Sequence, residues 1–183
     1  MPHRPVSPSP QGWRSRRPEI RFLAGFLGLL IAGFTVLSLN RVNDHLVEPF
    51  TAGVAAASAA LLDLLGQDVT IEGTVIRSPR FAVNIRNGCN GVETLIIFWA
   101  AVVAFPAGVR AKLAGLLLGT VAIQAINLIR VAALFLTGAY FPDFFDSSHT
   151  VVWQTIVILC GVVLWLLWAN RFAARRSPGG AGA

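Results

Sequence analysis

Residues 113–136 read LAGLLLGTVAIQAINLIRVAALFL, an apolar run that contains a single charged residue, Arg130. A helix over this run is long enough to cross the hydrocarbon core of a bilayer, which is about 30 Å thick. Hydrophobic residues make up 55% of the 183-residue chain, and charged residues only 13%. This composition excludes an ordinary soluble domain and predicts an integral membrane protein.

Three further apolar runs predict membrane spans on either side of this one. They cover residues 22–39, 92–106 and 150–169. The run over 92–106 is short for a span and needs help from its flanks or from a thinner bilayer. The sequence therefore predicts about four spans.

The two ends of the chain have a different composition from the rest. Residues 1–18 are rich in Pro, Ser and Arg, and residues 173–183 contain Ser-Pro-Gly-Gly. Such segments cannot bury enough apolar surface to fold, so both are expected to be disordered cytoplasmic tails. Residues 19–172 form the predicted membrane domain.

Residues 40–90 are expected to lie outside the cytoplasm. Within them, residues 46–65 are interpreted as a helix that lies on the membrane surface or folds back, not as a span. Residues 69–86 alternate in polarity around Ser78-Pro79, which predicts a short β-hairpin. The expected fold class is an all-α polytopic membrane protein with an interfacial helix and a short extracytoplasmic β-hairpin.

Basic residues decide the expected orientation. They cluster beside apolar runs, at Arg14, Arg16, Arg17 and Arg21, at Arg110 and Lys112, and at Arg171, Arg175 and Arg176. With four spans all three clusters lie in the cytoplasm, as the positive-inside rule requires. A span over 46–65 would put the second and third clusters outside. Few aromatic residues lie among these cations, so nucleic-acid binding is not expected.

Three chemically capable residues reach the outer membrane level in this topology. Cys89 directly precedes the second span, within Asn87-Gly88-Cys89-Asn90-Gly91, and His149 directly precedes the fourth. Arg130 lies about 27 Å along the third span, close to the outer edge of the core. An arginine embedded in apolar sequence is costly and is by default a functional hypothesis.

These residues together predict a cysteine nucleophile. The start of a helix favours a thiolate at Cys89, and its backbone N–H groups suit an oxyanion. His149 is the expected general base and then general acid. Arg130 would stabilise the thiolate or the oxyanion. Asp143 and Asp146 either orient His149 or are solvated loop charges.

Four neighbouring residues are candidates for positioning a substrate. Asn127 lies one turn before Arg130, and Gly91 allows a peptide backbone to approach closely. Asn90 and Glu93 have the spacing of a variant capping box at the start of the second span. Glu93 either serves only as this cap, which is the favoured interpretation, or pairs with Arg130.

Metal and disulfide chemistry have little support. Cys160 lies deep in the fourth span, too far from Cys89 for a disulfide, and is interpreted as a packing residue. His3 and His45 lack ligand spacing, so no metal site and no cofactor are expected.

The motifs over residues 69–170 resemble those of the exosortase/archaeosortase family of membrane transpeptidases. They are the Glu72-Gly73 to Val83 hairpin, Gly88-Cys89-Asn90-Gly91, Asn127-Leu128-Ile129-Arg130, and His149 before the last span. The stretch Asn-Gly-Cys-Asn-Gly-Val-Glu is most similar to the exosortase H subgroup. The usual family motif is Cys-Ser-Gly, so Asn90 stands where serine is typical.

The resemblance implies an enzyme with an active site of Cys89, Arg130 and His149. Its substrates would be secreted proteins with a C-terminal sorting signal, made of a short motif, a membrane span and a basic tail. The enzyme would lie in the bacterial cytoplasmic (inner) membrane with its site facing the periplasm. The acceptor nucleophile, water or an amine of an envelope component, stays open.

Two other functions fit the same residues. In a non-catalytic membrane scaffold, Cys89 and Arg130 would only pack or pair. In a small transporter subunit, the intramembrane arginine would bind an anion. The chain has no repeat symmetry and no paired broken helices, which argues against transport.

Overall fold

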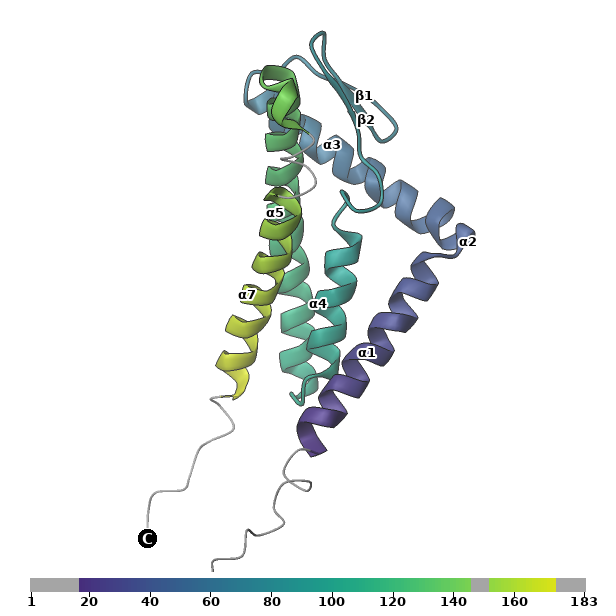
Figure 1. Cartoon of the computed structure of the whole chain (residues 1–183), viewed down its shortest axis with the longest axis vertical. Coiled ribbons are helices and arrows are strands. Elements are labelled where there is room, and N and C mark those ends of the chain that lie inside the picture. The colour runs from purple at the N-terminus through teal and green to yellow at the C-terminus, as the bar shows by residue number, and fades with distance from the viewer. Residues whose placement is uncertain (1–16, 146–151, 174–183) are drawn as a thin grey trace, which may run out of the picture.

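The computed structural model describes residues 17–145 and 152–173 (Figure 1). The helical elements are α1 (Arg17–Leu37), α2 (Asn40–Val42), the π-helical turn η1 (Asn43–Val47), α3 (Glu48–Leu64), α4 (Val92–Ala104), α5 (Val109–Tyr140), the 3-10 turn η2 (Pro142–Phe144) and α7 (Gln154–Ala173). The strands are β1 (Thr70–Glu72), β2 (Val75–Arg77) and β3 (Ala82–Asn84).

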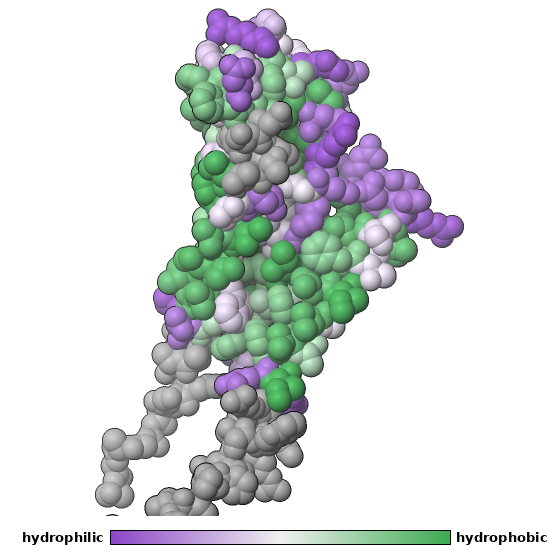
Figure 2. All heavy atoms as spheres, in the orientation of Figure 1, coloured by the Kyte–Doolittle hydropathy of each residue, from purple (hydrophilic) through white to green (hydrophobic). Residues whose placement is uncertain are grey.

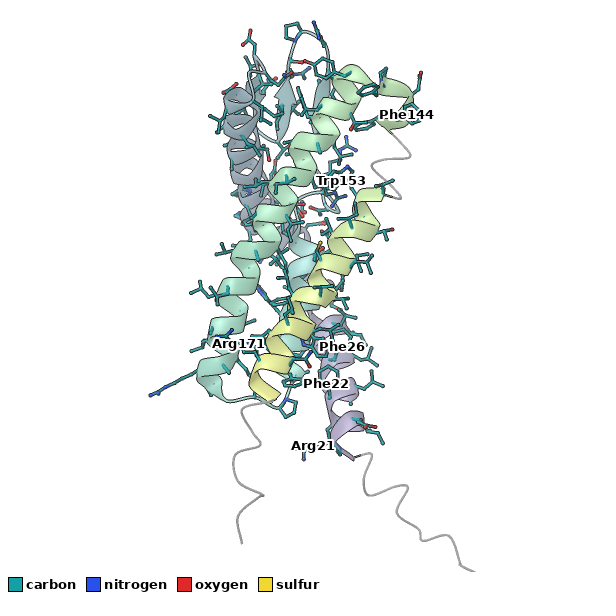
Figure 3. The ribbon with its side chains drawn as sticks, turned by 90° about the vertical axis from the view of Figure 1, so that its left-hand side faces the viewer. Arg21, Phe22, Phe26, Phe144, Trp153 and Arg171 are labelled. Atoms are coloured by element: carbon teal, nitrogen blue, oxygen red, sulfur yellow. The ribbon has the colours of Figure 1, made fainter. Side chains whose placement is uncertain are left out.

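Four helices run along the long axis of the molecule in alternating directions. In Figure 1, α1 and α5 rise from the lower end, while α4 and α7 return to it. Arg21 on α1 and Arg171 on α7 therefore lie at the same end (Figure 3). This is the arrangement that the distribution of basic residues predicts.

Four of the described helices are long and apolar enough to cross a membrane. They are Pro18–Leu37, Asn40–Leu64, Val109–Tyr140 and Gln154–Arg171. Figure 2 shows hydrophobic residues covering the lower half of the molecule, with hydrophilic residues gathered above them around the sheet. These features confirm a polytopic helical membrane protein.

The candidate spans differ from the sequence expectation at two helices. α4 has 13 residues, or about 20 Å of rise, which is shorter than the bilayer core. The continuous helix over residues 40–64 has the length and composition of a span. In Figure 1, however, α3 crosses the upper end of the bundle obliquely instead of returning beside α1. The surface location of residues 46–65 stays a prediction.

The predicted hairpin is part of a three-stranded antiparallel sheet in the order β1-β2-β3. The turn at Ser78-Pro79 joins β2 to β3, as expected. The additional strand β1 pairs with β2 across a turn at Gly73, where φ is +58°. This left-handed conformation is readily adopted by glycine, so the turn depends on that residue.

The sheet packs onto α3 and α5 through one apolar cluster. Its buried members are Val54, Ala55, Ala59, Leu62, Ile76, Ile85, Val131, Ala132 and Phe135. Because two of these residues come from the sheet and its exit, the cluster fixes the segment that leads directly to Cys89. Cys89 itself packs against this cluster.

A second cluster holds the lower part of the bundle together. α4 packs there against α5 and α7 through Leu95, Phe98, Val102 and Ile123, with Leu116, Leu164, Trp165 and Trp168 at the edge. A Cβ atom at Gly119 would overlap the ring of Phe98. The absence of a side chain there lets α4 and α5 approach closely, which fixes the height of α4 against α5.

Candidate active site

The turn before α4, residues 87–91, is shaped by two glycines and is called the Cys89 turn below. Gly88 has a φ of +87° and Gly91 a φ of +83°, a region that L side chains rarely adopt. The backbone N–H of Cys89 donates to the carbonyl of Arg86 at 2.9 Å. Gly91 is the residue that caps α4, so the thiol lies two residues before the cap of the helix.

Arg130 reaches this turn from the middle of α5. Its Nη1 donates to the Gly88 carbonyl at 3.1 Å, and its Nη2 lies 3.8 Å from Cys89 Sγ. Nη2 also donates to Gln154 Oε1, at the start of α7, at 3.2 Å. The residue is 2% exposed. No ion pair joins Arg130 to Glu93, although both residues are described.

Glu93 supports the backbone of the turn instead. Its Oε1 accepts a hydrogen bond from the Gly88 N–H at 2.7 Å. Asn90 Oδ1 accepts one from the Val92 N–H at 3.1 Å. The predicted capping box is wrong, because the cap is Gly91, one residue later than Asn90. The Gly88 and Val92 N–H groups are bonded to side chains, and the Arg130 guanidinium is the charged donor group that lies beside the thiol.

Asn90 ties the turn to the oblique helix above it. Its side chain is fully buried, and its Nδ2 donates to Thr51 Oγ1 on α3 at 2.9 Å and to Asn87 Oδ1 at 3.3 Å. Asn87 Nδ2 in turn donates to Asn43 Oδ1 in η1 at 2.9 Å. A serine in place of Asn90 is too short for this bridge, so the asparagine has a structural reason in this chain.

Asn127 lies beneath the turn, against Gly91. A Cβ atom built on Gly91 would lie 3.2 Å from Asn127 Cγ and 3.0 Å from Gln124 Nε2. Asn127 is fully buried, and neither of its amide atoms has a hydrogen-bond partner among the described residues. The side chain therefore supports the close approach of the turn to α5, and its contact with a substrate stays a prediction.

The other residues that the sequence analysis names have different outcomes. His149 and Asp146 fall outside the described residues. Asp143 is exposed in η2. Cys160 lies on α7, about 9 Å of helix rise below Gln154, and no disulfide joins it to Cys89. Within residues 17–145 and 152–173, no group of three or more His, Cys, Asp or Glu residues is arranged to hold a metal ion.

The protonation of Cys89 is set by burial and by two charges. Burial raises the pKa of the thiol above its ordinary value, because desolvation disfavours the thiolate. The Arg130 guanidinium lowers this pKa, and the Glu93 carboxylate raises it. Burial therefore opposes the thiolate that the helix start is expected to favour, and the protonation state of Cys89 stays a prediction.

Sequence reasoning missed Gln154 and Thr51. Gln154 is the first residue of α7, and a lone glutamine at the edge of an apolar run resembles an ordinary boundary residue. The Thr51 hydroxyl donates a hydrogen bond to the Val47 carbonyl one turn earlier, which is common for threonine in a helix. No local signal marks their contacts with Arg130 and Asn90, since these join elements far apart in the sequence.

Comparison with known protein families places this geometry in context. The model of the family described as Transmembrane exosortase (Exosortase_EpsH) matches residues 18–169. The chain belongs to the transmembrane exosortase family. This match covers α1 to α7, so the membrane bundle, the sheet and the Cys89 turn are all parts of an exosortase domain. No curated protein and no solved structure matches the chain. The family resemblance is confirmed, and the likeness to the exosortase H subgroup stays a prediction.

Proposed function

We propose that this exosortase is a cysteine peptidase or transpeptidase that cleaves the C-terminal sorting signals of secreted proteins. The observation that carries the proposal is the contact of Arg130 Nη2 with Cys89 Sγ, while Nη1 of the same guanidinium holds the Gly88 carbonyl. A buried arginine aimed at a thiol has a clear chemical use in acyl transfer and little use as a packing residue.

The first step forms a covalent intermediate. A base removes the Cys89 proton, and the thiolate attacks the carbonyl carbon of the substrate peptide bond. The C=O π electrons move to oxygen, and the Arg130 guanidinium stabilises this oxyanion. When the carbonyl re-forms, the C–N bond breaks, and the leaving amine takes the proton from the base. The products are a thioester on Cys89 and the released membrane-spanning segment.

The second step regenerates the free enzyme. Water or an amine attacks the thioester carbonyl, loses a proton to the base, and displaces the Cys89 thiolate, which is protonated again. Hydrolysis gives a free carboxylate, and transfer to an amine gives a new peptide or amide bond. We assign the base and acid role to His149, because burial disfavours the Cys89 thiolate and a base would help to form it.

The position of the thiol suits a membrane-anchored substrate. Cys89 precedes α4, and Gln154 begins α7, so the proposed site lies where two descending helices start. A sorting signal with a short motif followed by a span would place its motif at this level and its basic tail at the end where Arg21 and Arg171 lie. We propose that this level faces the periplasm across a bacterial inner membrane.

Processing of a sorting-signal protein in the native host tests the proposal. Cys89→Ala is expected to abolish cleavage, and Arg130→Ala and His149→Ala to reduce it strongly. Cys160→Ala is the matched control, since it removes the other cysteine from a place remote from the turn. Normal cleavage by the Cys89→Ala variant would exclude the peptidase and favour a scaffold or a transporter subunit.

A further inference from the structure

The strand β3 lies at the open edge of the sheet. The strand order is β1-β2-β3, so within residues 17–145 and 152–173 a strand neighbours β3 on one side only. β3 pairs with β2 in an antiparallel manner, and Val83 lies opposite Ile76. An edge strand presents unpaired backbone N–H and C=O groups, which form a template for another extended chain.

The backbone groups that face this edge can be assigned. Ser78 N–H donates to the Phe81 carbonyl, and Ile85 N–H donates to the Thr74 carbonyl. In an antiparallel ladder the bonded pairs recur at every second residue, so Val83 also faces β2. The N–H and C=O groups of the alternate residues, Ala82 and Asn84, point to the open side.

A cavity lies along β3 and ends at the proposed nucleophile. Its volume is about 360 Å³, within the range of about 300–1,000 Å³ that is typical of ligand sites. Residues of β3 and its exit line this cavity, together with Val131, Leu134 and Phe145. Cys89 lines the same cavity. A peptide in the cavity would therefore meet the edge of β3 and the thiol together.

We propose that the segment of the substrate next to the cleaved bond binds as an added strand along β3. This inference rests on the proposed peptidase function and specifies how that substrate is held. Backbone hydrogen bonds to Ala82 and Asn84 fix the extended peptide and its register. Alternate side chains of the peptide point into the cavity, where Val131 and Leu134 favour apolar groups. The occupant is thus an extended peptide with alternating apolar side chains.

The chemistry of the substrate agrees with this binding mode. A segment that links a folded secreted domain to a membrane span is extended enough to pair with a strand, whereas a folded domain is not. Strand addition recognises the backbone at every second residue, so it places one carbonyl reproducibly near the thiol. Positioning of this kind is what acyl transfer to Cys89 requires.

A proline at Ala82 tests the edge directly. Ala82→Pro removes an outward N–H and leaves the bonds to β2 in place, and proline is tolerated at such edge positions. The matched control is Ile71→Pro on β1. The N–H of Ile71 points outward from the β1 edge, which is the other edge of the same sheet. We expect Ala82→Pro to lower kcat/KM for processing of a reporter carrying the host's own sorting signal by about tenfold. Ile71→Pro should leave processing unchanged.

The outcomes separate this inference from the proposed function. If Cys89→Ala abolishes processing while Ala82→Pro and Ile71→Pro both process normally, the peptidase stands and strand addition fails. If Cys89→Ala processes normally, the peptidase itself fails. Retained labelling of Cys89 by a small thiol reagent in the Ala82→Pro variant shows that the turn is intact.

Cross-linking provides a second measurement that does not depend on proline. An Ala82→Cys variant in a Cys89→Ser, Cys160→Ser background is combined with a cysteine scan of the reporter segment before its span. Since every second residue of an added strand faces the same side, cross-links are expected at alternate reporter positions. Uniform cross-linking, no cross-linking, or cross-linking between two copies of the enzyme would overturn the inference.

Discussion

Nη2 of Arg130 lies 3.8 Å from Sγ of Cys89, and the two residues are 41 positions apart in the sequence. Arg130 comes from the middle of α5, and Cys89 from the turn before α4. The same guanidinium also bonds the Gly88 carbonyl and Gln154 Oε1. One side chain therefore joins the starts of α4 and α7 to α5.

Replacement of Arg130 by lysine separates charge from geometry. Lysine keeps the positive charge, but its single ammonium group cannot reproduce the guanidinium fork that binds Gly88 and faces Cys89. We expect Arg130→Lys to lower the turnover of a sorting-signal reporter by about 100-fold, the usual effect of losing an oxyanion donor. Turnover within a few-fold of wild type would show that charge alone is sufficient.

The pKa of Cys89 responds to Glu93 in a defined direction. The carboxylate raises the pKa of the thiol, so Glu93→Gln is expected to lower it. Glutamine can still accept the hydrogen bond from the Gly88 N–H, which keeps the turn in place. At a fixed pH below the pKa, the variant has more thiolate and should be alkylated faster, and its rate profile should move to lower pH. Glu19→Gln, in the first turn of α1, is the control and should leave the profile unchanged.

Gln154 is expected to be a positioning residue for Arg130. Gln154→Leu removes the acceptor of the Nη2 bond, which corresponds to about 1 kcal/mol or about a fivefold loss. The loss should appear in kcat and not in KM. The rate at which a thiol reagent alkylates Cys89 should change together with kcat. Gln154→Glu restores an acceptor and is expected to recover the orientation of Arg130. An unchanged kcat in Gln154→Leu would contradict this role.

Gly91 should tolerate no side chain. Its φ is +83°, and a Cβ atom would lie 3.0 Å from Gln124 Nε2. Gly91→Ala is expected to destabilise the protein by about 1–3 kcal/mol and to lower its thermal midpoint in detergent. Gly53→Ala on α3 is the matched control, because a Cβ atom there meets nothing within 4 Å. Alanine at that helical position should be neutral or stabilising, and equal midpoints for the two variants would refute the steric argument.

Asn90→Ser tests the residue that departs from the usual family motif. Serine can still accept from the Val92 N–H, but it cannot reach Thr51 on α3. We expect reporter processing to be largely retained, and the thermal midpoint to fall because a buried hydrogen bond is lost, at a cost of about 1 kcal/mol. Complete loss of processing, with an unchanged midpoint, would assign Asn90 a direct role in the chemistry.

The fold class followed from the sequence because a bilayer imposes simple length and polarity rules. The run over residues 113–136 and its neighbours predict membrane helices without knowledge of their packing. Length and composition alone do not decide the orientation of α3, because they also fit a span; the distribution of basic residues is what predicts a helix that does not span. The third strand was missed because β1 is defined by its pairing with β2, which no local pattern in the sequence marks.

Part of the candidate site also follows from the sequence, and the rest depends on the tertiary structure. The sequence by itself determined that Cys89 lies in a glycine-rich turn before an apolar helix and that Arg130 is an embedded charge. Only the tertiary structure decided that Arg130 contacts that thiol, that Gln154 holds the guanidinium, and that burial raises the pKa of Cys89. The physical reason is that polarity and chain length act locally, whereas contacts and desolvation depend on which helices pack together.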